Sequence, residues 1–264
     1  MLTALTRRQW MSAATGFLAG FSVTGSKSAF AQGINFVPNT AVSPIDLPQL
    51  RYSGRWNERP GAMRELSLEL RLRTRIESVR EPTVLSLDDD ALFHTPFLYV
   101  SGIGSLPKFD VQQQARLRGF IDLGGLLILD DADGGSDHRF RNSVQHLVSR
   151  LLPGSKMTLV PADHVLFRSF YIVDSPQGRT RTFEHVLGVQ DEGRLKVLFL
   201  LNDLGGALAS LSPGAHSFPC VPGGSLQREW AIRFAVNIVL YATCLDYKSD
   251  PAHVETLLRR RQWK

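Results

Sequence analysis

Short apolar runs alternate with helical patterns through most of the chain. Apolar runs bounded by polar or glycine positions are typical of strands, and apolar residues three or four positions apart are typical of helices. The pattern predicts strands at residues 50–52, 84–87, 97–100, 126–129 and 195–201. It predicts helices around residues 63–70, 117–121, 137–152 and 225–241.

The residues from Leu126 to Leu129 are all apolar, and the run ends abruptly at Asp130. An uninterrupted run of this kind predicts a strand that is covered on both faces, as in parallel sheets. Alternation of such strands with helices predicts one α/β domain, with a mostly parallel sheet and helices on both of its faces.

The last predicted helix has Trp230, Phe234, Ile238 and Tyr241 on one face, and Ser225 is expected to cap its start. Most of its remaining positions are also apolar, so we expect this helix to be buried against the sheet.

Two charged residues, Arg228 and Glu229, fall in the first turns of this apolar helix. Charged side chains are seldom buried without a partner. We therefore expect both to be largely buried and to contact residues 51–56 or the Asp203 turn. Either a salt bridge that fastens the helix or contacts to a ligand would satisfy them.

The composition is that of a globular domain, since 43% of the 264 residues are hydrophobic and 21% are charged. The net charge of +5 arises mostly at the two ends of the chain, and no long basic stretch interleaved with aromatic residues occurs between them. This pattern argues against nucleic-acid binding.

Two cysteines, Cys220 and Cys244, are too few for a disulfide framework or a four-cysteine zinc site. They could form one disulfide in an oxidising compartment or stay as two thiols.

The first 31 residues have the three parts of a secretory signal. These are a basic start, a short apolar stretch at residues 13–23 and an Ala-x-Ala site at residues 29–31. The pair Arg7 and Arg8 resembles the twin-arginine export signal of bacteria, so we expect export to the periplasm, with the signal either cleaved or kept as an anchor. The expected organisation is a twin-arginine signal peptide (1–31), a linker (32–46), the α/β domain (47–248) and a basic C-terminal tail (249–264).

Polar residues follow the predicted strands at their carboxyl ends, which is where doubly wound sheets bind ligands. We expect residues 53–55, 101–102, 130–131 and 202–203 to gather at one edge and line a pocket, although each could instead cap a helix or a turn. Asp163 and His164 are adjacent in a loop and could transfer a proton or form a local turn. The candidate ligand-binding residues are Arg51, Arg55, Trp56, Ser101, Asp131, Asp163, His164, Asn202, Asp203, Arg228 and Glu229.

The turn Asp130–Asp133 has the densest group of side chains that ligate metals. Asp131, Asp133 and His138 could bind a divalent cation, although the turn follows a strand and lacks the bidentate acid of a calcium-binding loop. No H-E-x-x-H, phosphate-binding loop or G-x-S-x-G motif occurs in the sequence. We predict no cofactor and no resident metal, and assign no catalytic residue. A hydrolase that uses the acidic turn, with or without a divalent metal, is the alternative.

Several segments together resemble the bacterial domain-of-unknown-function family 4159. The resemblance spans most of residues 47–262, and its strongest piece is the string CVPGGSLQREWA at residues 220–231. The other matching pieces are residues 50–60, 85–89, 97–102, 163–171 and 202–205, followed by Asn237, Tyr241 and residues 246–248.

This resemblance implies a flavodoxin-like, three-layer α/β/α domain that is similar to class I glutamine amidotransferases. In those enzymes a cysteine nucleophile occupies the sharp turn after a central strand. The corresponding turn here is Asp130–Asp133, which contains no thiol, and Cys220 belongs to another segment. Family members often have Gly-His-Gly where this chain has Gly102-Ile103-Gly104, so an imidazole is missing as well.

From these features we expect an exported amidotransferase-like domain without the cysteine nucleophile, and a binding protein rather than an enzyme. Its partner would be a small molecule or a protein of the cell envelope, and we expect no transmembrane span after signal cleavage. A purely structural envelope component is a third hypothesis.

The export signal can be tested directly. Replacing Arg7 and Arg8 by lysine should leave the precursor in the cytoplasm, because the receptor reads the arginine pair itself and not only its charge. Fractionation and immunoblotting of the two forms measure this. Unchanged processing of the variant, or normal export in cells without the twin-arginine system, would indicate the general secretory route.

Overall fold

A computed structural model of the chain describes residues 44–191 and 193–243. The proposed signal peptide, Cys244, the basic tail and most of the proposed linker lie outside these residues. The strands are β1 (Gln49–Leu50), β2 (Val84–Leu85), β3 (Phe97–Gly102), β4 (Leu126–Asp131), β5 (Thr158–Leu159), β6 (Leu187–Asp191) and β7 (Arg194–Leu200). The helices are α1 (Ala62–Thr74), α2 (Val111–Asp122), α3 (His138–Leu151), α4 (Leu204–Leu208) and α5 (Gly224–Thr243), with short 3-10 helices η2 (Asp90–His94) and η3 (Val165–Arg168).

Within the described residues the seven strands form one sheet in the order β2-β1-β3-β4-β7-β6-β5. Strands β2, β1, β3, β4 and β7 run parallel, whereas β6 and β5 are antiparallel at one edge. The described residues therefore form a single α/β domain with a mostly parallel sheet, as the sequence predicts.

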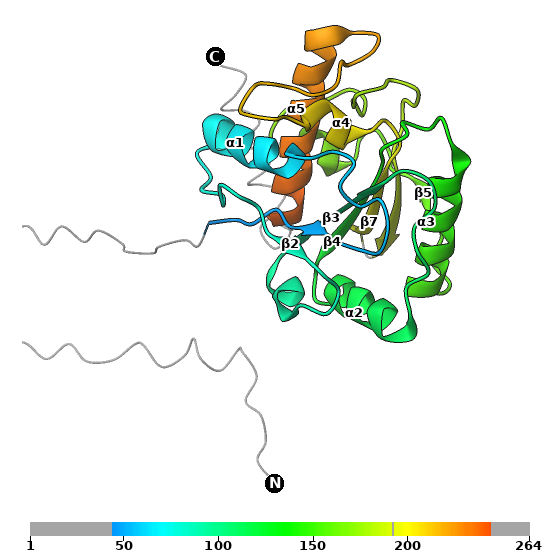
Figure 1. The fold of residues 1–264 in the computed structure, drawn as a ribbon. Coiled ribbons are helices and arrows are strands. Elements are labelled where there is room, and N and C mark those ends of the chain that lie inside the picture. The colour runs from blue at the N-terminus through cyan, green and yellow to red at the C-terminus, as the bar shows by residue number, and fades with distance from the viewer. Residues whose placement is uncertain (1–43, 192, 244–264) are drawn as a thin grey trace, which may run out of the picture. The chain divides into compact units, whose positions relative to one another are not determined.

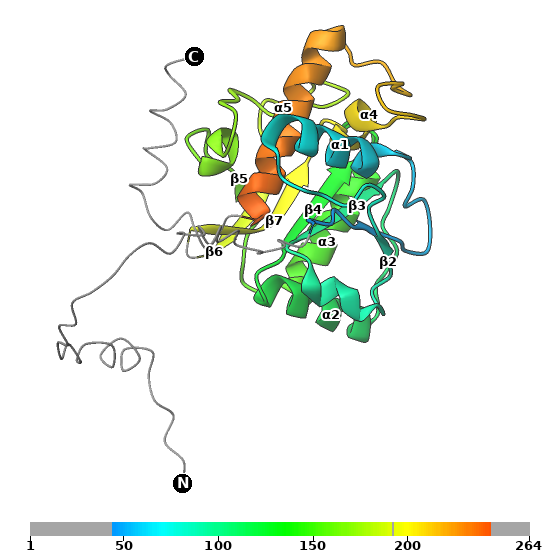
Figure 2. The ribbon, with the colours of Figure 1, turned by 90° about the vertical axis from the view of Figure 1, so that its left-hand side faces the viewer.

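The side chains of the central strands divide between two hydrophobic cores, because successive residues of a strand point to opposite faces. Phe97 and Tyr99 pack with residues of α1 and α5, and Leu98 and Val100 pack with residues of α2 and α3. Figures 1 and 2 show α1 and α5 on one side of the sheet and α2 and α3 on the other. Helices therefore cover both faces, which explains the unbroken apolar run of β4.

Local sequence explains where the helices begin. Asp110 and Gln113 form a reciprocal capping box at the start of α2, and the side chain of Asp137 caps α3. Helix α5 is buried over most of its length, as expected. The expectation that Ser225 caps it is wrong, because α5 already begins at Gly224.

The antiparallel edge strands β5 and β6 are not predicted by the sequence pattern. Strand β5 has only two residues and both are exposed, so it carries no apolar signal. Strand β6 has Gly188 beside Leu187 and ends in exposed polar residues. In the described ranges, residues 44–191 and 193–243, no helix is long and apolar enough to cross a membrane.

Candidate functional site

The carboxyl ends of β1, β3, β4 and β7 lie at one edge of the sheet, because these strands are parallel neighbours. The structure brings together the polar residues that follow them. Tyr52 Oη donates a hydrogen bond to the carbonyl of Ser101, at 2.8 Å. The amide nitrogens of Leu204 and Gly205, just after β7, donate to Asp130 at the end of β4.

Asp130 is fully buried, and both of its carboxylate oxygens are used within the protein. Its Oδ2 accepts from Tyr99 Oη at 2.6 Å and from the amide of Gly205 at 2.7 Å, while its Oδ1 accepts from the amide of Leu204 at 3.0 Å. Burial, and then the nearby charge of Asp203, raise the pKa of Asp130 to about 6 against the opposing effect of these bonds.

Asp203 is the second fully buried carboxylate, and it is held by two arginines. Arg59 donates from Nε and Nη2 to the two oxygens of Asp203, both at 2.7 Å, and Arg179 donates to Oδ2. The guanidinium of Arg59 also donates to the carbonyl of Ala132, which lies just beyond β4. Arg59 is only 5% exposed, so this pair is a buried, bidentate salt bridge.

The backbone after β7 has to come close to these groups. Asp203 has a left-handed φ of 54°. In this conformation the amide of Gly206 donates a hydrogen bond to Oδ1 of Asp203, at 2.8 Å. A Cβ atom on Gly205 would lie 2.2 Å from Tyr99 Oη, so only glycine fits at this position. The strand ends are thus sealed by the protein itself, and we call Tyr99, Asp130, Asp203, Arg59 and Arg179 the carboxylate network.

Asp131 differs from its neighbour Asp130 because one of its oxygens has no partner. The residue is fully buried, and its Oδ1 accepts from the amide of Asp133 at 3.1 Å. Oδ2 makes no hydrogen bond, and neither do the buried Nε and Nη2 atoms of Arg141, whose charge lowers the pKa of Asp131. Burial is the larger effect and raises this pKa to about 7.

The structure does not assemble the candidate metal site. Asp133 points its Oδ2 to the amide of Gly104 at 3.3 Å, and His138 is an exposed residue at the start of α3. Within residues 44–191 and 193–243, no three His, Cys, Asp or Glu side chains are grouped so that they could hold a metal ion. Asp131, Asp133 and His138 are therefore not a ligand set.

The other candidates after the strands have structural partners or lie at the surface. Arg55 is exposed and pairs with Glu58 at 2.7 Å, and Trp56 is half-buried and offers its carbonyl to Gln49. Asn202 is buried and uses its amide to bind four backbone groups of residues 176–183. Ser101 is fully buried, and its hydroxyl oxygen has no hydrogen-bond partner.

The adjacent pair Asp163 and His164 lies at the opposite end of the sheet, away from the carboxylate network. His164 caps η3 by accepting from the amide of Leu166 at 3.1 Å, and its ring lies 5.4 Å from that of Tyr241. Tyr241 Oη accepts from the amide of Leu195, at the amino end of β7.

Arg228 and Glu229 are half-buried rather than largely buried. Arg228 donates to the carbonyls of Ala207 in α4 and of Phe218, so it does reach the segment that follows the Asp203 turn. The expectation is wrong for Glu229, which pairs with Arg73 of α1 at 2.8 Å. Its hydrogen bonds with Arg73, ahead of those with Arg233, lower the pKa of Glu229 to about 2. This pair fastens α5 to α1.

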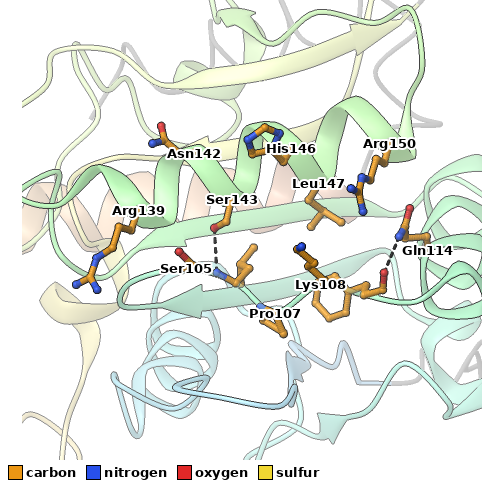
Figure 3. A pocket seen from close by; sticks show the side chains of 12 residues that line it. Ser105, Pro107, Lys108, Gln114, Arg139, Asn142, Ser143, His146, Leu147 and Arg150 are labelled. Atoms are coloured by element: carbon orange, nitrogen blue, oxygen red, sulfur yellow. Dashed lines mark hydrogen bonds between the residues drawn. The ribbon is translucent and has the colours of Figure 1, made fainter.

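Two hollows flank the segment Ser105–Phe109, which follows β3. The first, which we call the switch-point hollow, has a volume of about 400 Å³ and lies beyond β1 and β2. Its lining residues include Arg51, Ser53, Asp88 and Gln113. The second, which we call the basic cavity because Lys108, Arg139 and Arg150 line it, has a volume of about 460 Å³. It lies between this segment and α3, as Figure 3 shows. Of the candidate ligand-binding residues, only Arg51 lines either hollow, and of the residues expected to gather after the strands, only Ser53 does.

Sequence reasoning missed Arg59 and Tyr99 in the network and Lys108 and Arg150 at the cavity. The one usable signal was Tyr99, a hydroxyl-bearing residue within an apolar strand, since a buried tyrosine usually needs a hydrogen-bond partner. The charged residues gave no signal, because nothing in their local sequence distinguishes them from solvated surface residues.

The carboxylate network should be essential to stability. Arg59→Ala leaves the buried Asp203 short of a partner beside Asp130, so we expect a loss of about 3–5 kcal/mol in the free energy of unfolding. Chemical denaturation measures it. The matched control is Arg55→Ala, which breaks an exposed ion pair and should leave the unfolding midpoint nearly unchanged. Similar losses in the two variants would contradict the assignment.

Asp131 should make stability depend on pH. Its pKa rises from 3.8 in the unfolded chain to about 7 in the native protein, so the native state binds the proton more tightly. Its contribution to stability is therefore present at low pH and is lost as the pH rises through about 7. The stability of Asp131→Asn should not fall in this way. From acidic to mildly alkaline pH, its free energy of unfolding should therefore rise relative to that of the wild type by on the order of 2 kcal/mol.

Denaturation curves across this pH range test the prediction, with Asp133→Asn as the control from the same turn. Asp130 is present in all three proteins and its pKa is also raised, so its titration should make the free energy of unfolding of each depend on pH in the same way. Parallel stability profiles for the wild type and Asp131→Asn would show that Asp131 is not the titrating group.

A search of the curated proteins gave no match. The model of one protein family, described as "Domain of unknown function (DUF4159)", matches residues 46–243, which is well over half of the chain. That range contains the whole sheet and all the residues of the carboxylate network and the two hollows. The chain belongs to the DUF4159 family.

Proposed function

We propose that this chain is a periplasmic binding domain, exported by the twin-arginine pathway, which holds a small ligand in the switch-point hollow. In this proposal it has a flavodoxin-like, three-layer fold similar to class I glutamine amidotransferases but lacks their nucleophile. The proposed role requires no cofactor.

The strand order supports the flavodoxin-like arrangement. From β2 to β7 the order is β2-β1-β3-β4-β7, with β2 and β3 on opposite sides of β1. This corresponds to the 2-1-3-4-5 order of flavodoxin-like sheets, in which ligands bind beyond the carboxyl ends where the order reverses. The reversal here is at β1 and β3, and the switch-point hollow lies beyond β1, beside the segment that follows β3.

The hollow itself is the observation that carries the proposal. Its volume of about 400 Å³ is within the range of pockets that bind small molecules. Its lining combines the cations Arg51 and Lys108, the carboxylate of Asp88 and the hydroxyl of Ser53 with the apolar rings of Phe109 and Pro107. A few polar groups on an apolar surface are the usual composition of a ligand site.

The chemistry of the strand ends favours binding over catalysis. Asp130 and Asp203 are committed to the carboxylate network, and no thiol lies on the turn after β4. Cys220 is buried in the core, and burial raises the pKa of its thiol, which makes it a poor nucleophile.

The alternative is a hydrolase that uses Asp131 as a general base. A pKa of about 7 suits that role, which is the observation in its favour. It has less support, because Asp131 is fully buried and the described residues place no metal-ligand group around it.

A thermal-shift screen of the purified protein against a broad panel of metabolites tests the binding role. A ligand present at 100 times its Kd should add about 2.7 kcal/mol to stability. Ser53→Trp should fill the hollow and abolish the shift while leaving the melting temperature of the free protein unchanged. Ser155→Trp, at another exposed serine, is the matched control and should keep the shift.

No shift with any member of the panel would contradict the proposal. A turnover activity that Asp131→Asn abolishes would instead support the hydrolase.

A further inference from the structure

The basic cavity lies on the other side of the Ser105–Phe109 segment from the switch-point hollow, and its chemistry is different. Three of its lining residues are cationic, namely Lys108, Arg139 and Arg150, and none is acidic. The cavity therefore has a positive charge that is not balanced from within its own wall.

Two of these cations have no partner in the part of the chain that the structure describes. Arg139, at one end of the cavity, is paired with Asp137 at 2.6 Å. The side chains of Lys108 and Arg150 make no hydrogen bond or ion pair with residues 44–191 or 193–243. Figure 3 shows both charged ends directed into the space between the segment and α3.

Proximity to the end of α3 explains only part of this arrangement. Arg150 is in the last turn of α3, where a cation interacts favourably with the helix dipole. That effect does not explain Lys108, which comes from a loop and brings a second positive charge to the same space. Like charges that share a cavity repel each other, and a bound anion would remove the repulsion.

The walls of the cavity are held in place without a ligand. The amide of Leu106 donates to Ser143 Oγ at 2.9 Å, and Gln114 Nε2 donates to the carbonyl of Phe109 at 2.6 Å. These two bonds tie the segment to α3 and to α2, and Figure 3 draws both. A preformed site loses less conformational entropy when it binds.

The cavity is also partly apolar. Leu106, Phe109 and Leu147 line it and are buried, and Pro107 lies beside them. Its volume of about 460 Å³ would suit a molecule of metabolite size rather than a bare ion.

We propose that the basic cavity is a second binding site, which takes a small organic anion. The phosphate or carboxylate group of the ligand lies between Lys108 and Arg150, and its apolar body packs on Leu106, Phe109 and Leu147. This site does not depend on whether the switch-point hollow binds anything.

Calorimetric titration of the purified protein with phenyl phosphate tests the proposal, because this probe combines a dianion with an apolar ring. We expect a Kd in the millimolar range or tighter, with affinity that falls as salt is added. Phenol, which has the ring without the charge, should not bind. Inorganic phosphate, which has the charge without the ring, should bind more weakly than phenyl phosphate.

Single substitutions locate the site. Lys108→Ala and Arg150→Ala should each weaken the binding of phenyl phosphate by about tenfold, and the double variant should abolish it. Arg80→Ala is the matched control, because it removes the same charge from an exposed position outside the cavity. Ser53→Trp should have no effect on this ligand, which separates this site from the switch-point hollow.

All of these side chains are exposed, so the variants should melt at the temperature of the wild type. The proposal is overturned if phenyl phosphate does not bind at millimolar concentrations, if phenol binds equally well, or if the double variant binds like Arg80→Ala.

Discussion

The burial of two carboxylates, Asp130 and Asp203, is the constraint on which the carboxyl edge of this domain depends. Burying each carboxylate removes a negative charge from water at a cost of several kcal/mol, and only hydrogen-bonding or oppositely charged groups close to it can offset this cost. Tyr99 and two backbone amides surround the first, and Arg59 and Arg179 hold the second. The network thereby joins β3, β4, the loop after β1 and the turn after β7, so that the position of each depends on the others.

This constraint also decides where chemistry can occur. The carboxyl ends of the strands, where parallel sheets of this kind bind ligands, are closed by contacts within the protein, and Gly205 leaves no room even for a methyl group. Space for ligands is found instead on both sides of the Ser105–Phe109 segment. Lys108 lines both hollows, so one loop after β3 contributes to each proposed site.

Local patterns in the sequence determined the class of the fold. The run Leu126–Leu129 identified a strand covered on both faces, and the nearly continuous apolar character of residues 230–241 identified a buried helix. Both predictions are correct because burial of apolar side chains depends mainly on periodicity within a few residues. The pattern did not predict β5 and β6, because β5 is short and exposed and β6 ends in exposed polar residues, so neither has a clear apolar periodicity.

Only the tertiary structure decided which polar residues meet. The sequence placed Asp130 and Asp203 at strand ends, and so at one edge, but it gave no reason to choose Arg59 as the partner of Asp203, 144 positions away. It also left open whether His164 transfers a proton or forms a local turn, and it overlooked Lys108 and Arg150. The physical reason is that a charged side chain looks the same in sequence whether it is solvated, paired or facing a cavity. Its role depends on distant segments that only the folded chain brings together.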